Sequence, residues 1–293
     1  LGSVFHYQSD RDAKKTIISK RLNNSTNVNY DWRGRSQGVQ SNTQGMLAFQ
    51  RQIFVGAGFE YGYERLYEHE FGRKRKENRS GAFFGDDSER SAHRKEVYGF
   101  IEATPIKQLF FLTVLSFSNG NLDYDFGAGP KYPRVSAPYL AWQERCRLVS
   151  NCTEPEPGLD PGAGDQLYIE TSVRYQPTNA LQTQLSYTRT KLTRHDTNLV
   201  AFDDNIVSLR STYQFSRDFF ARMRLDYSNI STRFRPQLIL GWTPSPGTAI
   251  YTGYNDDLNY KGFNPYTGLP ENGFRGNGRS FFIKASYLFR KSF

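Results

Sequence analysis

Apolar and polar side chains alternate along most of this chain from residue 53 onward. In residues 53–64 one face carries Ile53, Val55 and Phe59, and the other carries glycine and glutamate. Alternation at every second position is typical of a strand with two unlike faces. The pattern predicts ten strands, at residues 53–64, 95–104, 108–118, 167–175, 181–191, 206–215, 219–227, 236–242, 247–254 and 278–293.

Residues 1–52 give a weaker signal. Residues 1–8 and 27–35 are candidate strands, the second because Val28, Tyr30 and Trp32 alternate with polar residues. The polar segments between them are interpreted as loops. We expect two to four strands in this part, and therefore about 12–14 strands in residues 1–293, which we treat as one domain.

The predicted connections alternate in length. Short turns lie at 104–108 (TPIKQ), 176–180 (QPTNA), 243–247 (TPSPG) and around Arg217, and longer loops at 67–93, 119–165, 193–204 and 255–278. Outer-membrane barrels have short periplasmic turns and longer extracellular loops. The predicted fold is therefore all-β, a transmembrane, antiparallel, up-and-down β-barrel.

The C-terminal stretch supports this interpretation. Phe281, Ile283 and Ala285 share one face with Tyr287 and Phe289, and the chain ends on Phe293. An apolar, aromatic-tipped last strand is typical of barrels in the bacterial outer membrane, with Tyr287, Phe289 and Phe293 as its C-terminal signal. The prediction places the chain in that membrane, with lipid as its first partner.

Composition excludes a bundle of membrane helices but leaves a soluble β-sandwich as an alternative. The mean hydropathy of −0.67 is too low for a bundle of membrane helices, and no apolar run approaches the ~20 residues that a spanning helix needs. Alternation alone does not distinguish a lipid-facing sheet from a soluble β-sandwich. The loop lengths, the aromatic residues at strand ends and Phe293 favour lipid.

On the barrel interpretation one face of the strands lines a polar lumen. Its charged residues are Glu60, Glu102, Glu170, Arg174, Arg210, Arg222, Arg224, Asp226, Lys284 and Arg290. Such residues either pair across strands and stiffen the wall, or form a conducting or substrate-guiding surface with a slight preference for anions. Both alternatives stay open here.

The longest predicted loop, 119–165, contains both cysteines of the chain, Cys146 and Cys152. Two cysteines six positions apart in an oxidising compartment predict a small disulfide, with free or metal-bound thiols as the alternative. The same loop is a candidate contact for partner proteins. No signal peptide is visible at Leu1, so we expect a processed chain or part of a longer one.

Motifs for catalysis are not found. The four histidines are dispersed, and neither a zinc spacing such as HExxH nor a phosphate-binding loop is present. We therefore expect no enzyme and no cofactor, apart from possible Ca²⁺ at the aspartate pairs 86–87, 203–204 and 256–257, which we place in extracellular loops. The net charge of +9 is scattered, with one dense cluster at 73–76, so no nucleic-acid partner is expected.

The C-terminal third resembles a known family. The stretches GWTPSPGTAIY (241–251) and KASYLFR (284–290) are similar to the end of bacterial outer-membrane proteins of unknown function, in which a carbohydrate-binding (family nine-like) module precedes a C-terminal barrel. The resemblance implies that this chain is the barrel part. Any sugar-binding residues of that module would lie outside this chain, and none is carried over.

Together these observations predict a porin-like channel or a membrane anchor associated with carbohydrate handling at the cell surface. The alternatives are an accessory or scaffold subunit of a larger outer-membrane assembly, and a soluble β-rich sugar-binding domain.

Overall fold

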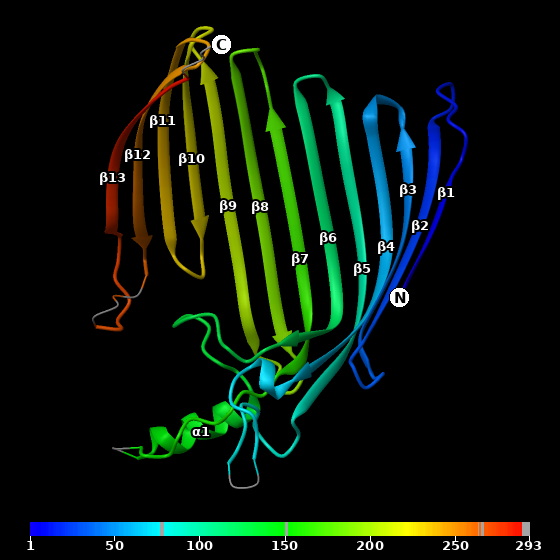
Figure 1. The fold of residues 1–293 in the computed structure, drawn as a ribbon, viewed down its shortest axis with the longest axis vertical. Coiled ribbons are helices and arrows are strands. Elements are labelled where there is room, and N and C mark those ends of the chain that lie inside the picture. Colours follow the sequence, from blue (N-terminus) through cyan, green and yellow to red (C-terminus); the bar gives the residue numbers. More distant parts are fainter. Residues whose placement is uncertain (77–78, 150–151, 263, 265–266, 289–293) are drawn as a thin grey trace, which may run out of the picture. The chain divides into compact units, whose positions relative to one another are not determined.

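The computed structural model describes residues 1–76, 79–149, 152–262, 264 and 267–288. Within them the chain forms one sheet of 13 strands, which lie in chain order from β1 to β13 (Figure 1). The strands are β1 (Gly2–Gln8), β2 (Ile17–Tyr30), β3 (Ser36–Phe49), β4 (Ile53–Tyr67), β5 (Glu89–Ile106), β6 (Leu109–Asp123), β7 (Gly162–Tyr175), β8 (Leu181–Arg194), β9 (Val200–Gln214), β10 (Phe219–Ser228), β11 (Arg233–Ser245), β12 (Thr248–Tyr260) and β13 (Phe274–Tyr287). The all-β, antiparallel, up-and-down prediction is confirmed.

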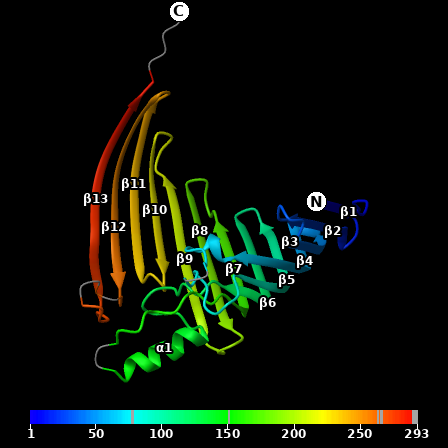
Figure 2. The ribbon, with the colours of Figure 1, turned by 60° about the horizontal axis from the view of Figure 1, so that its bottom comes forward.

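Three helical segments interrupt the strands: η1 (Gln50–Gln52), η2 (Glu68–Glu70) and α1 (Ala137–Arg147). The sequence interpretation had no helix in 119–165, and α1 corrects it. Ser136 precedes the helix in extended conformation and a proline occupies its first turn, an arrangement that starts a helix. Figure 2 shows α1 at the strand ends where the loop 124–161 leaves β6 and returns to β7. No helix in the described residues is long and apolar enough to cross a membrane.

The N-terminal strands are the largest correction. Residues 17–26, interpreted as loop, belong to β2, and the whole of β3 was missed. Both strands are rich in amides and hydroxyls, so apolar alternation is weak. These groups bond to each other across the two strands: Thr26 Oγ1 lies 2.9 Å from Ser41 Oγ, and Asn24 Nδ2 donates to Thr43 Oγ1 at 2.7 Å.

The alternation of connection lengths is confirmed in part. The connections 107–108, 176–180, 215–218 and 246–247 are short, and 68–88, 124–161 and 261–273 are long. The predicted longer loop at 193–204 is reduced to residues 195–199, and the connection 229–232 is similarly short, whereas 9–16 is longer than both. Several strands extend further toward the long-loop end than predicted. As a result Asp203 and Asp204 lie in β9, and Asp256 and Asp257 in β12, not in loops.

The two faces of the sheet differ in chemistry. Between β9 and β10 the register pairs Leu209 with Leu225 on one face and Arg210 with Arg224 on the other. Because all described strands belong to one sheet, no second sheet covers the apolar face. Ile283 is 81% exposed and Leu209 is half-buried, which excludes the soluble sandwich. Lipid covers such a face in the bacterial outer membrane, where antiparallel β-barrels are the spanning structures. Among the described residues the sheet runs from β1 to β13, and no pairing of β13 with β1 closes it.

The sheet divides into two compact units, each described by itself. The N-terminal unit comprises residues 1–101, 114–169 and 189–203, and the C-terminal unit comprises residues 102–113, 170–188 and 204–293. The buried hydrophobic cluster of the N-terminal unit is small and lies at strand ends, with Val135, Leu192 and Ala201 packed against Phe202. Elsewhere the faces of the described strands contact water or lipid instead of a buried core.

Candidate functional site

The described charged residues that were predicted to line a lumen are spread over six strands. Glu60 is in β4, Glu102 in β5, Glu170 and Arg174 in β7, Arg210 in β9, Arg222, Arg224 and Asp226 in β10, and Lys284 in β13; Arg290 lies outside the described residues. In β9 and β10 the register places these residues on the polar face. That this face looks into a lumen stays a prediction. Of the C-terminal signal, Tyr287 ends β13, and Phe289 and Phe293 lie outside the described residues.

Glu60 is the centre of a polar network in the N-terminal unit. Its carboxylate accepts hydrogen bonds from Gln40 Nε2 (3.1 Å) and Asn42 Nδ2 (3.0 Å), and it pairs with Arg94. The hydroxyl of Tyr98 donates to Asn42 Oδ1 at 2.9 Å. Strands β3, β4 and β5 are thus joined by side chains as well as by backbone. Arg94 also lies 3.6 Å from the Glu96 carboxylate, so one guanidinium is shared by two acids.

Glycines in β4 make room for this network. A Cβ on Gly58 would lie 2.4 Å from the ring of Tyr98, and one on Gly56 would lie 2.4 Å from the ring of Phe100. The aromatic rings therefore rest directly on the backbone of β4. This close approach is possible only at glycine. It keeps the Tyr98 hydroxyl within hydrogen-bond distance of Asn42.

Two adjoining hollows lie over β1–β6, and together we call them the amide hollow. Their volumes are about 300 and 350 Å³, and both are lined by Asn27 and Gln40. The other polar lining residues are His6, Asn23, Asn24, Ser25, Asn29, Asn42, Gln44, Tyr63, Glu64, Arg94 and Asn121. Amides both donate and accept hydrogen bonds, so the hollow suits a neutral ligand rich in hydroxyl groups.

Sequence reasoning missed the amide hollow because it missed β2 and β3. The signal was nevertheless present. Asn23, Ser25, Asn27 and Asn29 recur at every second position, and the register sets them opposite Gln44, Asn42, Gln40 and Gly38 of β3. In both strands the alternating residues are polar. A search for alternating apolar residues does not detect such a pair of strands.

The polar face of the C-terminal unit carries arginine in place of amide. Arg210 and Arg224 are directly opposite each other in the register of β9 and β10. Arg224 pairs with Asp226 (Nε to Oδ2, 2.5 Å), and Ser208 donates to the same carboxylate at 2.6 Å. Arg222 lies near the ring of Phe220, at 5.5 Å from its centroid.

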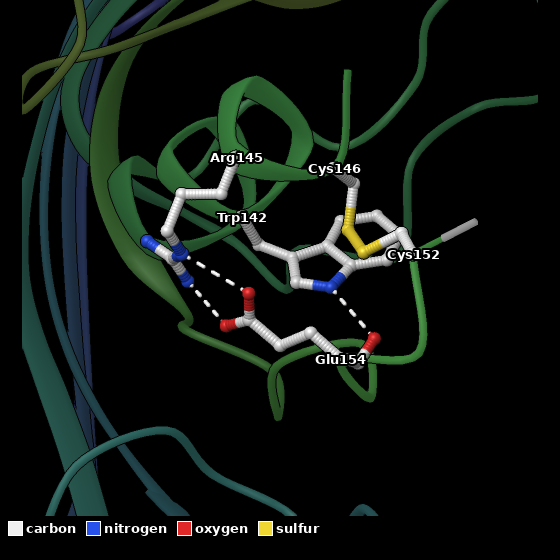
Figure 3. Close-up of a disulfide and its surroundings, with 5 residues drawn as sticks. All are labelled: Trp142, Arg145, Cys146, Cys152 and Glu154. Atoms are coloured by element: carbon white, nitrogen blue, oxygen red, sulfur yellow. Dashed lines mark hydrogen bonds and ion pairs between the residues drawn. A yellow bond between two sulfur atoms is a disulfide. The ribbon is translucent and has the colours of Figure 1, made fainter. Parts of the chain in front are cut away.

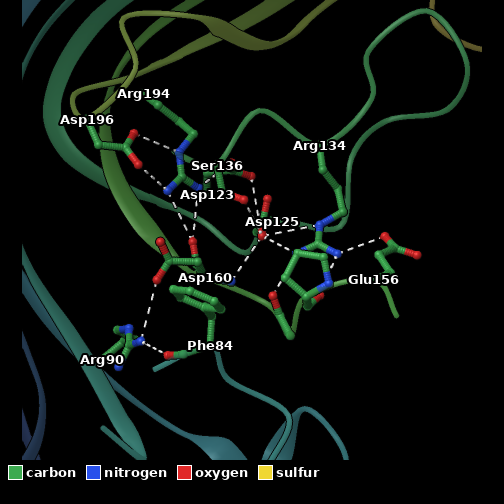
Figure 4. A network of polar contacts seen from close by, with 12 residues as sticks. Phe84, Arg90, Asp123, Asp125, Arg134, Ser136, Glu156, Asp160, Arg194 and Asp196 are labelled. Atoms are coloured by element: carbon green, nitrogen blue, oxygen red, sulfur yellow. Dashed lines mark hydrogen bonds and ion pairs between the residues drawn. The ribbon is translucent and has the colours of Figure 1, made fainter. Parts of the chain in front are cut away.

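At the long-loop end a buried ion-pair network holds the segment 124–161 (Figure 4). Asp125 is fully buried, and its Oδ2 accepts from Arg134 Nη2 at 2.7 Å and from Ser136 Oγ at 2.8 Å. Arg134 also donates to Glu156 Oε1 at 2.9 Å and to Gly158 O at 2.8 Å. One arginine thus joins both halves of the loop.

Arg194, at the end of β8, forms the second half of this network. Its guanidinium is 1% exposed and donates to Asp123 Oδ2 (2.9 Å), to both carboxylate oxygens of Asp196 (2.9 and 2.8 Å) and to Asp160 O (3.1 Å). Arg90 reaches the Asp160 carboxylate at 3.4 Å. Burial of these charges is tolerable because each is paired and hydrogen-bonded.

The predicted disulfide is confirmed and closes the end of α1 (Figure 3). Cys146 and Cys152 are joined, with Cα atoms 5.1 Å apart. Beside it Arg145 binds Glu154 in a bidentate pair (3.1 and 2.6 Å), and Trp142 Nε1 donates to Glu154 O at 3.1 Å. No residue of α1 is buried, so the helix stays accessible.

Several loop carboxylates have lowered pKa values. The backbone N–H of Arg35, together with its guanidinium and the Tyr67 hydroxyl, lowers the pKa of Asp31 from 3.8 to about 2. The Arg194 guanidinium lowers the pKa of Asp196, and that of Arg145 lowers the pKa of Glu154. These acids are therefore ionised at neutral pH.

The aspartate pairs have donors of their own. Asp203 binds Arg189 at 2.8 Å, Asp204 accepts from Ser228, and Asp256 pairs with Arg279 at 3.1 Å. In the part of the chain that the structure describes, no group of three or more His, Cys, Asp or Glu side chains is arranged to hold a metal ion. Calcium at these pairs stays an untested expectation.

Comparison with known proteins gives fold neighbours only. No family profile and no curated protein sequence matches the chain. Among solved structures it is similar to the in-vitro folded OmpT, an outer membrane protein of Vibrio cholerae (12% identity, 98% of this chain and 94% of that chain, TM-score 0.35). It is also similar to a Pseudomonas aeruginosa FadL homologue (12%, 97% and 77%, TM-score 0.28) and to the ferric-catecholate import receptor Fiu of E. coli K12 (9%, 97% and 54%, TM-score 0.39).

Proposed function

We propose that this chain is the wall of a porin-like outer-membrane channel whose polar face admits small polar solutes, with neutral carbohydrates as the favoured class. The observation that carries the proposal is the amide hollow. Asn27 and Gln40 line both of its parts. Of the two carboxylates in or beside the hollow, Glu60 pairs with Arg94, and Glu64 accepts a hydrogen bond from the Tyr124 hydroxyl.

The chemistry of the amide hollow favours sugars over ions. A charged solute needs a countercharge, whereas a hydroxyl-rich solute needs alternating donors and acceptors, which Asn and Gln supply. Cross-strand bonds among Gln40, Asn42 and Glu60 hold these groups in place before a ligand arrives. Less side-chain freedom is therefore lost on binding.

Single-channel recording in planar bilayers tests the proposal. We expect reproducible ohmic steps that maltotriose blocks in a concentration-dependent way. The double variant Asn27→Ala/Gln40→Ala should conduct but bind maltotriose at least tenfold more weakly, and Asn179→Ala, in an exposed turn, should behave as the parent. A silent protein, or block that survives the double variant, contradicts the proposal.

A second role, as a scaffold within an envelope assembly, is supported by the long loop. The segment 124–161 is held by Arg134 and Arg194 and presents an accessible helix. Beside the helix, Leu148 and Val149 are 75% and 56% exposed. Cross-linking through a cysteine at Gln143 in native membranes should then capture a specific protein, and capture of lipid alone would count against this role.

A further inference from the structure

We propose that Arg210, Arg222 and Arg224 form a binding site for a dissolved oxyanion, of the phosphate or carboxylate class, on the polar face of β9 and β10. The inference rests on the proposed function in one respect: the polar face must be in contact with water. The ligand class, an oxyanion, differs from the neutral solutes proposed for the amide hollow.

The register supplies the first argument. Arg210 and Arg224 are directly paired across β9 and β10, which brings their Cβ atoms to about 4.5–5.5 Å. Arg222 is two residues from Arg224 on the same face and lies diagonally from Arg210, at a spacing of about 7–8 Å that long side chains span. Three guanidinium groups thus start from neighbouring positions on one face.

The charge balance supplies the second argument for the site. Asp226 binds Arg224, but a single carboxylate does not balance three cations. Among the described residues neither Arg210 nor Arg222 has a carboxylate within 4 Å. Like charges directly opposite each other destabilise a strand pair. An arrangement that costs stability in the empty protein is relieved when an anion binds between the charges.

The residues around the three arginines supply the third argument. On β11 the residue opposite Arg224 is Gln237, the one opposite Arg222 is Ile239, and Asp226 faces Arg235, which has its own partner in Asp257 at 3.6 Å. On β9 Thr212 is opposite Arg222. The neighbours are therefore uncharged or already paired groups. Guanidinium forks bind phosphate and carboxylate oxygens in bidentate geometry.

Binding of inorganic phosphate to the full chain in detergent micelles, followed by ³¹P line broadening, tests the site. We expect millimolar or tighter binding by the parent protein and at least tenfold weaker binding by Arg210→Gln/Arg224→Gln. Arg217→Gln removes an arginine from the exposed turn between the same two strands and should bind as the parent. The charge-conserving variant Arg210→Lys/Arg224→Lys should be intermediate, because it keeps the charge and loses the fork.

Unchanged binding in Arg210→Gln/Arg224→Gln, an equal loss in Arg217→Gln, or no binding by the parent overturns the site. Addition of phosphatidic acid to the micelles should not compete, and competition would overturn the assignment to a dissolved ligand. Retained heat-modifiable electrophoretic mobility confirms that each variant is folded. A protein that is silent in bilayers yet binds phosphate would remove the channel and leave the site; one that conducts without binding phosphate would do the reverse.

Discussion

Charged side chains are arranged differently in the two units of the sheet. In the N-terminal unit the buried charges Asp125, Arg194 and Glu68 each have an opposite charge within hydrogen-bond distance. On the polar face of the C-terminal unit Arg210 and Arg224 are set side by side, and Arg210 has no acidic partner among the described residues.

The difference follows from solvation. A charge removed from water must be paired, because the desolvation cost otherwise exceeds any gain. A charge left in water is stabilised by the solvent, and a group of them produces a field that attracts counter-ions. The N-terminal network therefore serves structure, and the C-terminal arginines are available for a solute.

The largest expected effect is the loss of a cation from the N-terminal network. Arg134→Met leaves the fully buried Asp125 without its partner, which costs about 3–5 kcal/mol. We expect the segment 124–161 to open, with loss of hydrogen-exchange protection and rapid proteolysis there. Arg147→Met, which removes an exposed pair with Glu144, is the control. Unchanged protection in Arg134→Met would show that the network is not structural.

A second test asks what the two units share. A Cβ on Gly253 would lie 2.2 Å from the ring of Phe282, and one on Gly58 would lie 2.4 Å from that of Tyr98. Gly253→Val and Gly58→Val should each lower the free energy of unfolding by about 1–3 kcal/mol, measured by urea denaturation in micelles. Gly278→Val, with open space around it, should cost less. Equal losses at all three positions would mean that ring-on-glycine packing is not the cause.

The third prediction is a gain in stability, whereas the first is a loss. Arg210→Gln removes the repulsion with Arg224, so we expect the free energy of unfolding to rise by about 0.2–1 kcal/mol in the absence of anions. Adding phosphate should stabilise the parent protein and not the variant. Destabilisation of Arg210→Gln would indicate that this arginine has a structural partner, and the comparison between the two units would fail.

The smallest effect concerns pH. Asp31 has a pKa of about 2 in the folded protein against an ordinary value of 3.8. A depressed pKa stabilises the folded state above pH 3.8, and this contribution is lost as the pH falls from 3.8 through 2. Protection factors of the amides in the turn 31–35, which are corrected for the intrinsic pH dependence of exchange, should fall over that range. Asp31→Asn should show low protection at all pH values, and a carboxyl titration near 3.8 by ¹³C NMR would contradict the prediction.

The regular part of the sheet was predictable because lipid-facing strands leave a strong trace. Leu209, Leu225 and Ile283 alternate with charged residues, and the turns at 176–180 and 243–247 contain proline or glycine. The strands β2 and β3 were not predictable by the same rule. Their stability comes from pairing with neighbours of similar polarity, such as Asn27 with Gln40, and pairing is not visible in either strand alone.

The sequence by itself determined the class of fold, the longest connections, the strands from residue 53 onward and the Cys146–Cys152 pairing. These depend on local pattern and short separations. The tertiary structure alone decided that Glu60 meets Arg94, that Asp125 meets Arg134 and that Arg210 lies opposite Arg224. The path of the loop brings Asp125 to Arg134. Strand register sets the other two pairs, and a shift of one residue would place a strand residue such as Arg210 on the other face of the sheet.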